Sequence, residues 1–402
     1  MKRSLLFLLL YSPLFLIAQP GNQDPVIRSV QPSDMTGSSQ AVLVDDVPLA
    51  HTAQLLPLTK QGALVGKNTP SKQIDQVFEN LSLALKEGGS DIDQAVKINV
   101  YLSDEALIPD VQRAFSQRFN TGNKPAVSFV VGDISLPDAD VAMDAVAVSN
   151  LATGDDHVRY FNSAALYRLS KGAHVSVLPA GGVTYVSGQA DEGDVVEATR
   201  GTLEQLAATL QHLGIRKDQV IQLKSFMQPM TDTRLVEEEF VRFFGETAVP
   251  PLVFVDWLSQ NPVIEIELIA ASPATTAEVS DPLSFITPPM MTPSPVYSKV
   301  TQINHGTKFY TSSLYGESAD PEKQTAEIFA SLKALLTSIG SDFAHLGKAT
   351  YYVSDEQASS SLNDIRPSFY DPKRAPAASK ATVKAVGNGK GINIDMIGVV
   401  KE

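Results

Sequence analysis

One type of segment occurs three times in this chain: a helix-like stretch that ends in glycine and leads into an apolar, strand-like run. The three copies are NLSLALKEGGSDIDQAVKINVYLSD from Asn80, QLAATLQHLGIRKDQVIQLKSFMQP from Gln205 and SLKALLTSIGSDFAHLGKATYYVSD from Ser331. Their helix-ending glycines are Gly89, Gly214 and Gly340, which lie 125 and then 126 residues apart. A nearly constant period of this length predicts three domain-sized modules rather than the short turns of a solenoid.

Each module has the same predicted order of elements. A hairpin comes first, as in HVSVLPAGGVTYVSGQ at 174–189, and an amphipathic helix such as 71–87 follows it. The glycine after this helix is typical of a left-handed cap. A strand, a second helix and a closing hairpin of two strands complete the order β-β-α-β-α-β-β, with a turn signal at Asn388 and Gly389 in the third module. The fold class is therefore α+β.

Composition shifts along the chain predict where the modules begin and end. Prolines and threonines in 271–295 preclude a regular element there, and the stretch before the first module is polar. The expected parts are a signal peptide at 1–18, a polar stretch at 19–40, repeat 1 at 41–150, repeat 2 at 160–272, a Pro-rich linker at 273–295 and repeat 3 at 296–402.

A sheet that carries two helices on one face must bury its other face. Three copies in one chain offer a solution, because their sheets can pack face-in around a common axis and form an intramolecular pseudo-trimer. We therefore expect a monomer that acts as a pseudo-trimer.

The first residues fit a secretory leader. Lys2 and Arg3 form a basic start, residues 5–17 an apolar core interrupted by Pro13, and Ala18 is a small residue at the expected cleavage point. We therefore expect an exported protein, periplasmic or secreted, with no membrane span after removal of the leader.

Net charge and amino-acid composition limit the kinds of ligand and partner that the chain is expected to bind. A net charge of −13 disfavours binding to the phosphate backbone of nucleic acids. The chain has no cysteine, which excludes disulfides and thiolate chemistry, and its six histidines show no metal-ligand spacing. We expect no metal and no cofactor, and a small-molecule ligand as the partner.

Three stretches carry a resemblance to a known family. VTYVSGQADEGD (183–194), PVYSKV (295–300) and NPVIEIELIA (261–270) resemble the second strand, the opening stretch and the closing strand of the RidA/YjgF family of small trimeric proteins. Together with the repeated helix-to-strand segment, the resemblance covers nearly all of 41–402. It implies a chorismate-mutase-like fold in each repeat and clefts where neighbouring repeats meet.

The resemblance also implies a chemistry, the hydrolysis of reactive enamines and imines. In the family an arginine pairs with the substrate carboxylate, and a glutamate on the last strand positions the attacking water. The arginine position falls on Val127, Pro250 and Ala378, so the arginine is absent from all three repeats. The glutamate position falls on Ala142, Glu265 and Asn393, so Glu265 is the candidate catalytic residue.

Further cleft residues follow from the same resemblance. The Ser-Gly-Gln turn is aligned with Thr52 to Gln54, with Ser187, Gly188 and Gln189, and with Ser312 to Leu314. The family's tyrosine position is aligned with His174 in repeat 2 and Tyr297 in repeat 3. The candidate binding residues are Thr52, Gln54, His174, Ser187, Gly188, Gln189, Tyr297 and Ser312. A polar residue of the second helix maps to Gln112, Glu237 and Asn363.

Two points stay open at this stage. Another cation could replace the arginine, or each candidate could be a solvated surface charge; the candidates are Arg113, Arg234, Arg366 and Arg374. Glu267 has acidic counterparts in Asp144 and Asp395, which predicts a structural or axial role, and we expect it to face away from Glu265.

Two hypotheses follow. The first is an exported RidA-family protein that acts on or binds small imine, enamine or keto-acid-like metabolites at clefts between repeats. The alternative is a non-catalytic scaffold that retains the fold for binding a ligand or a protein.

Overall fold

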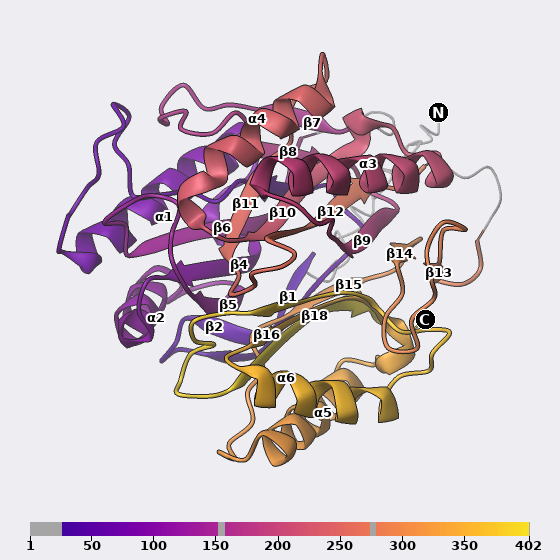
Figure 1. The fold of residues 1–402 in the computed structure, drawn as a ribbon. Helices are drawn as coiled ribbons and strands as arrows, with labels where there is room; N and C mark the ends of the chain where they lie inside the picture. Colours follow the sequence, from indigo (N-terminus) through magenta and orange to yellow (C-terminus); the bar gives the residue numbers. More distant parts are fainter. Residues whose placement is uncertain (1–25, 152–156, 274–278, 402) are drawn as a thin grey trace, which may run out of the picture.

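The computed structural model describes residues 26–151, 157–273 and 279–401 (Figure 1). The expected signal peptide lies outside the described residues. Repeat 1 contains β1 (Ile27–Ser33), β2 (Ser38–Val44), β3 (Leu49–Thr52), α1 (Pro70–Glu87), β4 (Ala95–Leu102), α2 (Ile108–Arg118), β5 (Ala126–Val131) and β6 (Val141–Val148). Repeat 2 contains β7 (Arg159–Phe161), β8 (Val175–Leu178), β9 (Val183–Gln189), α3 (Val195–Leu213), β10 (Val220–Met227), α4 (Thr233–Phe244), β11 (Leu252–Asp256) and β12 (Ile264–Ala271). Repeat 3 contains β13 (Leu283–Ile286), β14 (Val300–Ile303), β15 (Lys308–Thr311), α5 (Pro321–Ser338), β16 (Leu346–Val353), α6 (Glu356–Ile365), β17 (Ala377–Thr382) and β18 (Ile392–Val399).

Each repeat begins with one strand more than predicted. The extra strands β1 and β13 lie in 19–40 and 273–295, where we expected a polar stretch and a linker without regular elements. Both expectations were wrong because these strands lie at sheet edges, β1 pairing with β2 and β13 with β14. An edge strand needs only one ladder of hydrogen bonds, so it tolerates Pro32 within β1 and Pro282 and Pro288 beside β13.

The helices follow the local sequence closely. α1 begins with Pro70 in its first turn, where the missing N–H costs nothing, and buries the face that carries Ile74, Val77 and Leu81. Asp194 caps α3 by accepting hydrogen bonds from the N–H groups of Val196 and Glu197. The repeated glycines all have positive φ, +66° at Gly89, +67° at Gly214 and +72° at Gly340, which confirms the predicted left-handed caps.

The strand order within each repeat differs from the predicted closing hairpin. β4 pairs in parallel with β5 and antiparallel with β6, so it separates the two closing strands, and β10 and β16 do the same in the other repeats. Asn388 and Gly389 have the positive φ values of a tight turn, yet their loop leads from one side of β16 to the other. The predicted hairpin was wrong because turn chemistry specifies a local reversal and not the strand that is paired next.

The opening strands are exchanged between repeats. β8 pairs with β3 of repeat 1, β14 with β9 of repeat 2, and β2 with β15 of repeat 3. The predicted hairpin at 174–189 was therefore wrong, since its two strands join different sheets. Repeat 2 thus adds strands to the sheet of repeat 1, repeat 3 to that of repeat 2, and repeat 1 to that of repeat 3, which produces three six-stranded sets. Two of these sets are joined into one sheet by the single residue pair Ser39 and Ala126.

Both faces of the sheets are buried. One core lies between the helices and sheet of each repeat. The opposite faces meet in shared clusters to which all three repeats contribute, as shown by Tyr101, Phe226 and Tyr352, which occupy equivalent strand positions. The inner faces of the three sheets therefore cover one another. No helix within the described residues is long and apolar enough to cross a membrane.

Candidate functional site

The strand register identifies which residues are equivalent in the three repeats. Three residues are aligned with the family's glutamate, and in the strand register each of them lies opposite an aromatic residue, Tyr101, Phe226 or Tyr352. These residues are Ala142, Glu265 and Asn393. The register therefore agrees with the sequence alignment here, and Glu265 is the one acid among them.

The arginine position needs a correction in repeat 2. Val127 lies opposite Ile98 in β4, and Ala378 lies opposite Ala349 in β16. The same place on β11 is Leu252, opposite Leu223. Our assignment to Pro250 was wrong by two residues, because the doubled proline precedes the strand and does not belong to it. None of the three residues at this register position is an arginine.

The Ser-Gly-Gln turn needs a correction in repeat 1. Its third residue bridges to the closing strand, and the equivalent bridges join Leu55 to Met143, Gln189 to Ile266 and Leu314 to Ile394. Thr52 is thus one residue too early, and Ala53 is the counterpart of Ser187 and Ser312. Thr52 is buried, and its hydroxyl accepts a hydrogen bond of 2.9 Å from the N–H of Ala145.

The tyrosine position also needs a correction. The N–H of Ala53 donates to the carbonyl of His174, and in the next junction the N–H of Ser187 donates to the carbonyl of Lys299. His174 is therefore equivalent to Lys299 and not to Tyr297. The hydroxyl of Tyr297 lies 2.5 Å from Nζ of Lys299 and accepts its hydrogen bond.

The two aligned serines join neighbouring repeats. The hydroxyl of Ser187 donates to the carbonyl of Ser298 at 2.6 Å and accepts from the N–H of Ala378 at 2.8 Å. Ser312 repeats this arrangement, donating to the carbonyl of Ser39 at 2.6 Å and accepting from the N–H of Val127 at 2.7 Å. Both hydroxyls thus satisfy backbone groups at a junction between repeats.

Glu265 lies at the junction of repeats 2 and 3. It is half-buried on β12 and packs against Gly188, where an added Cβ would lie 1.9 Å from its Oε1. Burial and the neighbouring charge of Glu267 raise the pKa of Glu265 from 4.5 to about 7. Its carboxyl group therefore exchanges a proton near neutral pH.

Glu267 shares the face of Glu265, and our expectation that it faces away was wrong. Side chains two residues apart in a strand point to the same side. Glu267 is buried 2.5 Å from Nζ of Lys348 and accepts from the hydroxyl of Ser379, and the Lys348 ammonium holds its pKa below the ordinary value. The two neighbouring glutamates thus have different protonation behaviour.

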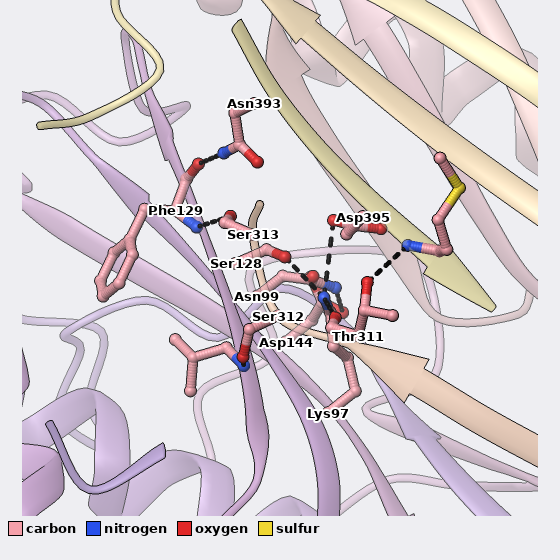
Figure 2. A network of polar contacts seen from close by, with 12 residues as sticks. Lys97, Asn99, Ser128, Phe129, Asp144, Thr311, Ser312, Ser313, Asn393 and Asp395 are labelled. Atoms are coloured by element: carbon pink, nitrogen blue, oxygen red, sulfur yellow. Dashed lines mark hydrogen bonds and ion pairs between the residues drawn. The ribbon is translucent and has the colours of Figure 1, made fainter. Parts of the chain in front are cut away.

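The counterparts of Glu267 are also held by the protein. Asp144 accepts from the hydroxyl of Tyr101 at 2.6 Å and from the amide of Asn99 at 3.0 Å. Asp395 lies 3.5 Å from Nζ of Lys97, which reaches across from repeat 1 (Figure 2). These contacts agree with the structural role predicted for this position.

The cavity beside Gly188 measures about 310 Å³ and also belongs to the junction of repeats 2 and 3. The amide of Gln189 donates to Thr209 at 3.0 Å, while its Oε1 is buried without a hydrogen-bond partner among the described residues. A buried acceptor without a partner favours a ligand that donates a hydrogen bond.

The junction of repeats 1 and 2 encloses a different cavity of about 350 Å³. Leucine is the commonest residue in its wall, and Gln54, His174, Arg234 and Glu237 line it as well. The Gln54 amide donates to the carbonyl of Phe254 at 3.0 Å, and Nδ1 of His174 accepts from the N–H of Ser163 at 3.0 Å. Burial lowers the pKa of His174 and raises that of Glu237.

The junction of repeats 3 and 1 is closed by hydrogen bonds. The Asn393 amide donates to the carbonyl of Phe129 at 2.8 Å, and the N–H of Phe129 donates to the hydroxyl of Ser313 at 3.2 Å (Figure 2). The side-chain amide of Asn393 thus stands where repeat 2 has Glu265, and it joins β18 to β5 by a hydrogen bond.

Among the arginines considered as substitutes, Arg234 lines the cavity between repeats 1 and 2. Arg113 pairs with Asp110, Arg374 with Asp281, and Arg234 lies 3.9 Å from Glu238. Arg366 is buried, with its guanidinium 5.0 Å from the ring centre of Tyr351. A cation that sequence reasoning missed, Lys380, lies on β17 two residues beyond Ala378 and therefore on the same strand face.

Among residues 26–151, 157–273 and 279–401, no group of three His, Cys, Asp or Glu side chains is placed to hold a metal ion.

Comparison with known proteins agrees with this architecture. The pattern of the Endoribonuclease L-PSP family matches residues 30–149, 166–272 and 296–400. Protein MMF1 of Saccharomyces cerevisiae is 31% identical over 125 residues, which cover 31% of this chain and 83% of that protein. The crystal structure of yeast Mmf1 is similar with 27% identity and a TM-score of 0.24, and covers 31% of this chain and 99% of its own. A conserved Rid-family protein of Yersinia pestis is similar with 23% identity and a TM-score of 0.29, over 31% of this chain and 99% of its own.

The three matches together span well over half of the chain, so the protein belongs to the Endoribonuclease L-PSP (RidA/YjgF) family and carries three tandem copies of its domain.

Proposed function

We propose that this protein hydrolyses small imines or enamines at the junction of repeats 2 and 3, with Glu265 positioning the attacking water and exchanging its proton. One observation carries the proposal: Glu265, which the resemblance aligns with the family's acid, packs against Gly188 with its pKa raised to about 7. A carboxyl group with a pKa near the working pH serves best as a general acid and base.

Further observations support a small-molecule substrate. A cavity of about 310 Å³ at the same junction has the size of a small-ligand site, and Gly188, against which Glu265 packs, lines it together with Gln189. The net charge of −13 disfavours a nucleic acid as substrate. In this proposal the chain works as a monomer in which three repeats replace the subunits of a trimer, and the basic, apolar leader at 1–18 directs it out of the cytoplasm.

A second candidate is the non-catalytic scaffold. It is favoured by the loss of the arginine at Val127, Leu252 and Ala378, and by the closed junction of repeats 3 and 1. In that case Glu265 would contribute to binding without turnover.

The test is hydrolysis of freshly generated 2-iminobutanoate by the full chain, compared with Glu265→Gln. We expect the substitution to lower kcat by about a hundredfold or more, since it removes the proton-exchanging group. Glu246→Gln is the matched control, because Glu246 is exposed on the surface. Unchanged turnover in the Glu265 variant, or no hydrolysis of any imine by the wild-type protein, would favour the scaffold.

A further inference from the structure

The cavity between repeats 1 and 2 lies at a different junction from Glu265, and leucine is the commonest residue of its wall. Seven leucines line it, among them Leu136 of repeat 1 and Leu252 of repeat 2, together with Phe254. Its volume of about 350 Å³ is enough for a small organic molecule, and apolar walls with a few polar groups are typical of such sites. The size and composition of this cavity therefore indicate a second binding site.

A strap of repeat 2, residues 162–173 between β7 and β8, forms one side of this cavity. The ring of Tyr167 in the strap packs against Gly62 of repeat 1, where an added Cβ would lie 2.7 Å from the nearest ring atoms. Farther along the strap, the N–H of Lys171 donates to Oε2 of Glu237 on α4 at 2.9 Å. The strap is thus fastened to both repeats and closes the cavity on that side.

The charges beside the cavity disfavour an ionised ligand. Its wall contains one arginine and no lysine within the described residues, and the side chain of that arginine, Arg234, is 84% exposed and 3.9 Å from Glu238. A carboxylate inside the cavity would therefore have no buried cation beside it and would face the acid Glu237. Glu237 is equally unsuited to a cationic ligand, because it already accepts a hydrogen bond from the strap and burial raises its pKa.

One polar side chain of the wall is oriented by the protein and offers an acceptor. The Gln54 amide is fixed by its hydrogen bond to the carbonyl of Phe254, at 3.0 Å. No hydrogen bond among residues 26–151, 157–273 and 279–401 uses Oε1 of Gln54, so this oxygen is available to a ligand. Nδ1 of His174, in contrast, already accepts from the N–H of Ser163. An amide oxygen of this kind complements a hydroxyl group, which donates one hydrogen bond.

We propose that the cavity between repeats 1 and 2 binds an uncharged, largely apolar molecule that carries one hydroxyl group, the chemical class of aliphatic and aromatic alcohols. Its carbon skeleton packs against the leucines and Phe254, and its hydroxyl donates to Oε1 of Gln54. The site is separate from the junction of repeats 2 and 3, so it goes beyond the proposed function and does not depend on hydrolysis there.

The test measures binding to the full chain of N-phenyl-1-naphthylamine, an uncharged dye with one N–H donor whose fluorescence rises in an apolar site. We expect saturable binding of one dye molecule per chain. Displacement then compares three probes of equal chain length at pH 8, namely 1-octanol, octanoate and octylammonium. Octanol should displace the dye at a roughly tenfold lower concentration than either ion, because neither ion finds a buried counter-ion in the cavity.

Three variants locate the site. Leu136→Trp adds bulk to the cavity from the loop after β5 and should weaken dye binding by about tenfold or more. Leu258→Trp is the matched control, because Leu258 is 48% exposed and lies outside this cavity, so dye binding should be unchanged. Leu252→Arg places a cation in the wall and should reverse the order of the probes, so that octanoate displaces the dye best.

Three outcomes would overturn the inference. They are absent or non-saturable dye binding by the wild type, displacement by octanoate or octylammonium at the same concentration as by octanol, and equal dye binding in the wild type and Leu136→Trp. The comparison of the three probes on the wild type decides the inference even if Leu136→Trp or Leu252→Arg fails to fold. Hydrolysis at Glu265 is measured separately, so a failure here leaves the proposed function standing.

Discussion

Glu265 should make the stability of this protein depend on pH in a characteristic direction. Its pKa in the folded chain is about 7 against an ordinary value of 4.5, so the folded protein holds this proton more tightly than the unfolded chain. The associated stability is fully present below about pH 4.5 and is lost as the pH rises through about 7. Glu265→Gln, which cannot ionise, should remove this loss.

The magnitude follows from the two pKa values. Each pH unit between them corresponds to about 1.4 kcal/mol, so the difference from 4.5 to about 7 sets an upper limit of about 3.5 kcal/mol. Glu265 is only half-buried, and screening by solvent reduces the expected effect to about 1–2 kcal/mol. We therefore expect the stability of Glu265→Gln relative to wild type to be about 1–2 kcal/mol greater at pH 8 than at pH 5.

The assay is urea denaturation at pH 5, 6, 7 and 8, followed by the fluorescence of Trp257, the single tryptophan of the chain. Glu246→Gln is again the control, since it makes the same chemical change on the exposed surface. Parallel pH profiles for wild type and Glu265→Gln would refute the raised pKa, and with it the main support for general acid–base chemistry at this residue.

Three further predictions concern the same junction and the helix before it. Glu267→Gln removes the carboxylate of the buried ion pair between Glu267 and Lys348. It should lower the free energy of unfolding, measured by urea denaturation at pH 7, by about 3–5 kcal/mol. A loss below about 0.5 kcal/mol would contradict a buried ion pair. Gly188→Ala places a Cβ 1.9 Å from Oε1 of Glu265 and should displace that carboxylate, so imine hydrolysis should fall as far as it does in Glu265→Gln. Gly391→Ala is the control, because its Cβ would meet its neighbours at 3.4–3.6 Å, and it should leave hydrolysis unchanged. Full activity of Gly188→Ala would show that residue 188 and the Glu265 carboxylate do not touch. Asp194→Ala removes the N-cap of α3 and should lower the free energy of unfolding by about 1 kcal/mol. Asp194→Asn keeps a side-chain acceptor for the cap and should retain most of that stability. Equal losses in both variants would show that the Asp194 carboxylate acts by its charge and not by capping.

Much of the local structure could be predicted from the sequence. The predicted helix at 71–87 differs by one residue from α1 (Pro70–Glu87), and the repeated glycines have the expected positive φ. These features depend on helical periodicity and on glycine's freedom of backbone rotation, which act within a few residues. Ala142, Glu265 and Asn393, which the sequence aligns with one another, are also equivalent in the strand register, because IEIEL alternates unambiguously and the register of a strand follows its pattern of burial.

Alignment errors arose where the local pattern was weak. The doubled proline before β11 displaced the arginine position from Leu252 to Pro250, and the short β3 allowed a slip of one residue at Thr52. The edge strands β1 and β13 were missed because composition alone does not distinguish an edge strand with a nearby proline from a linker.

The sequence by itself determined that this chain contains three copies of one α+β module, where its helices and inner strands lie, and that Glu265 is the one acid among the aligned residues Ala142, Glu265 and Asn393. Only the tertiary structure decided which strands pair and which side chains meet. Equivalent strands from three repeats present nearly the same hydrogen-bonding edge. The periodicity of the sequence therefore does not predict that β8 pairs with β3 and not with β9. The contact of Glu267 with Lys348, which lie far apart in the chain, depends on that choice of partners, because a contact between distant residues leaves no periodic signal in either segment.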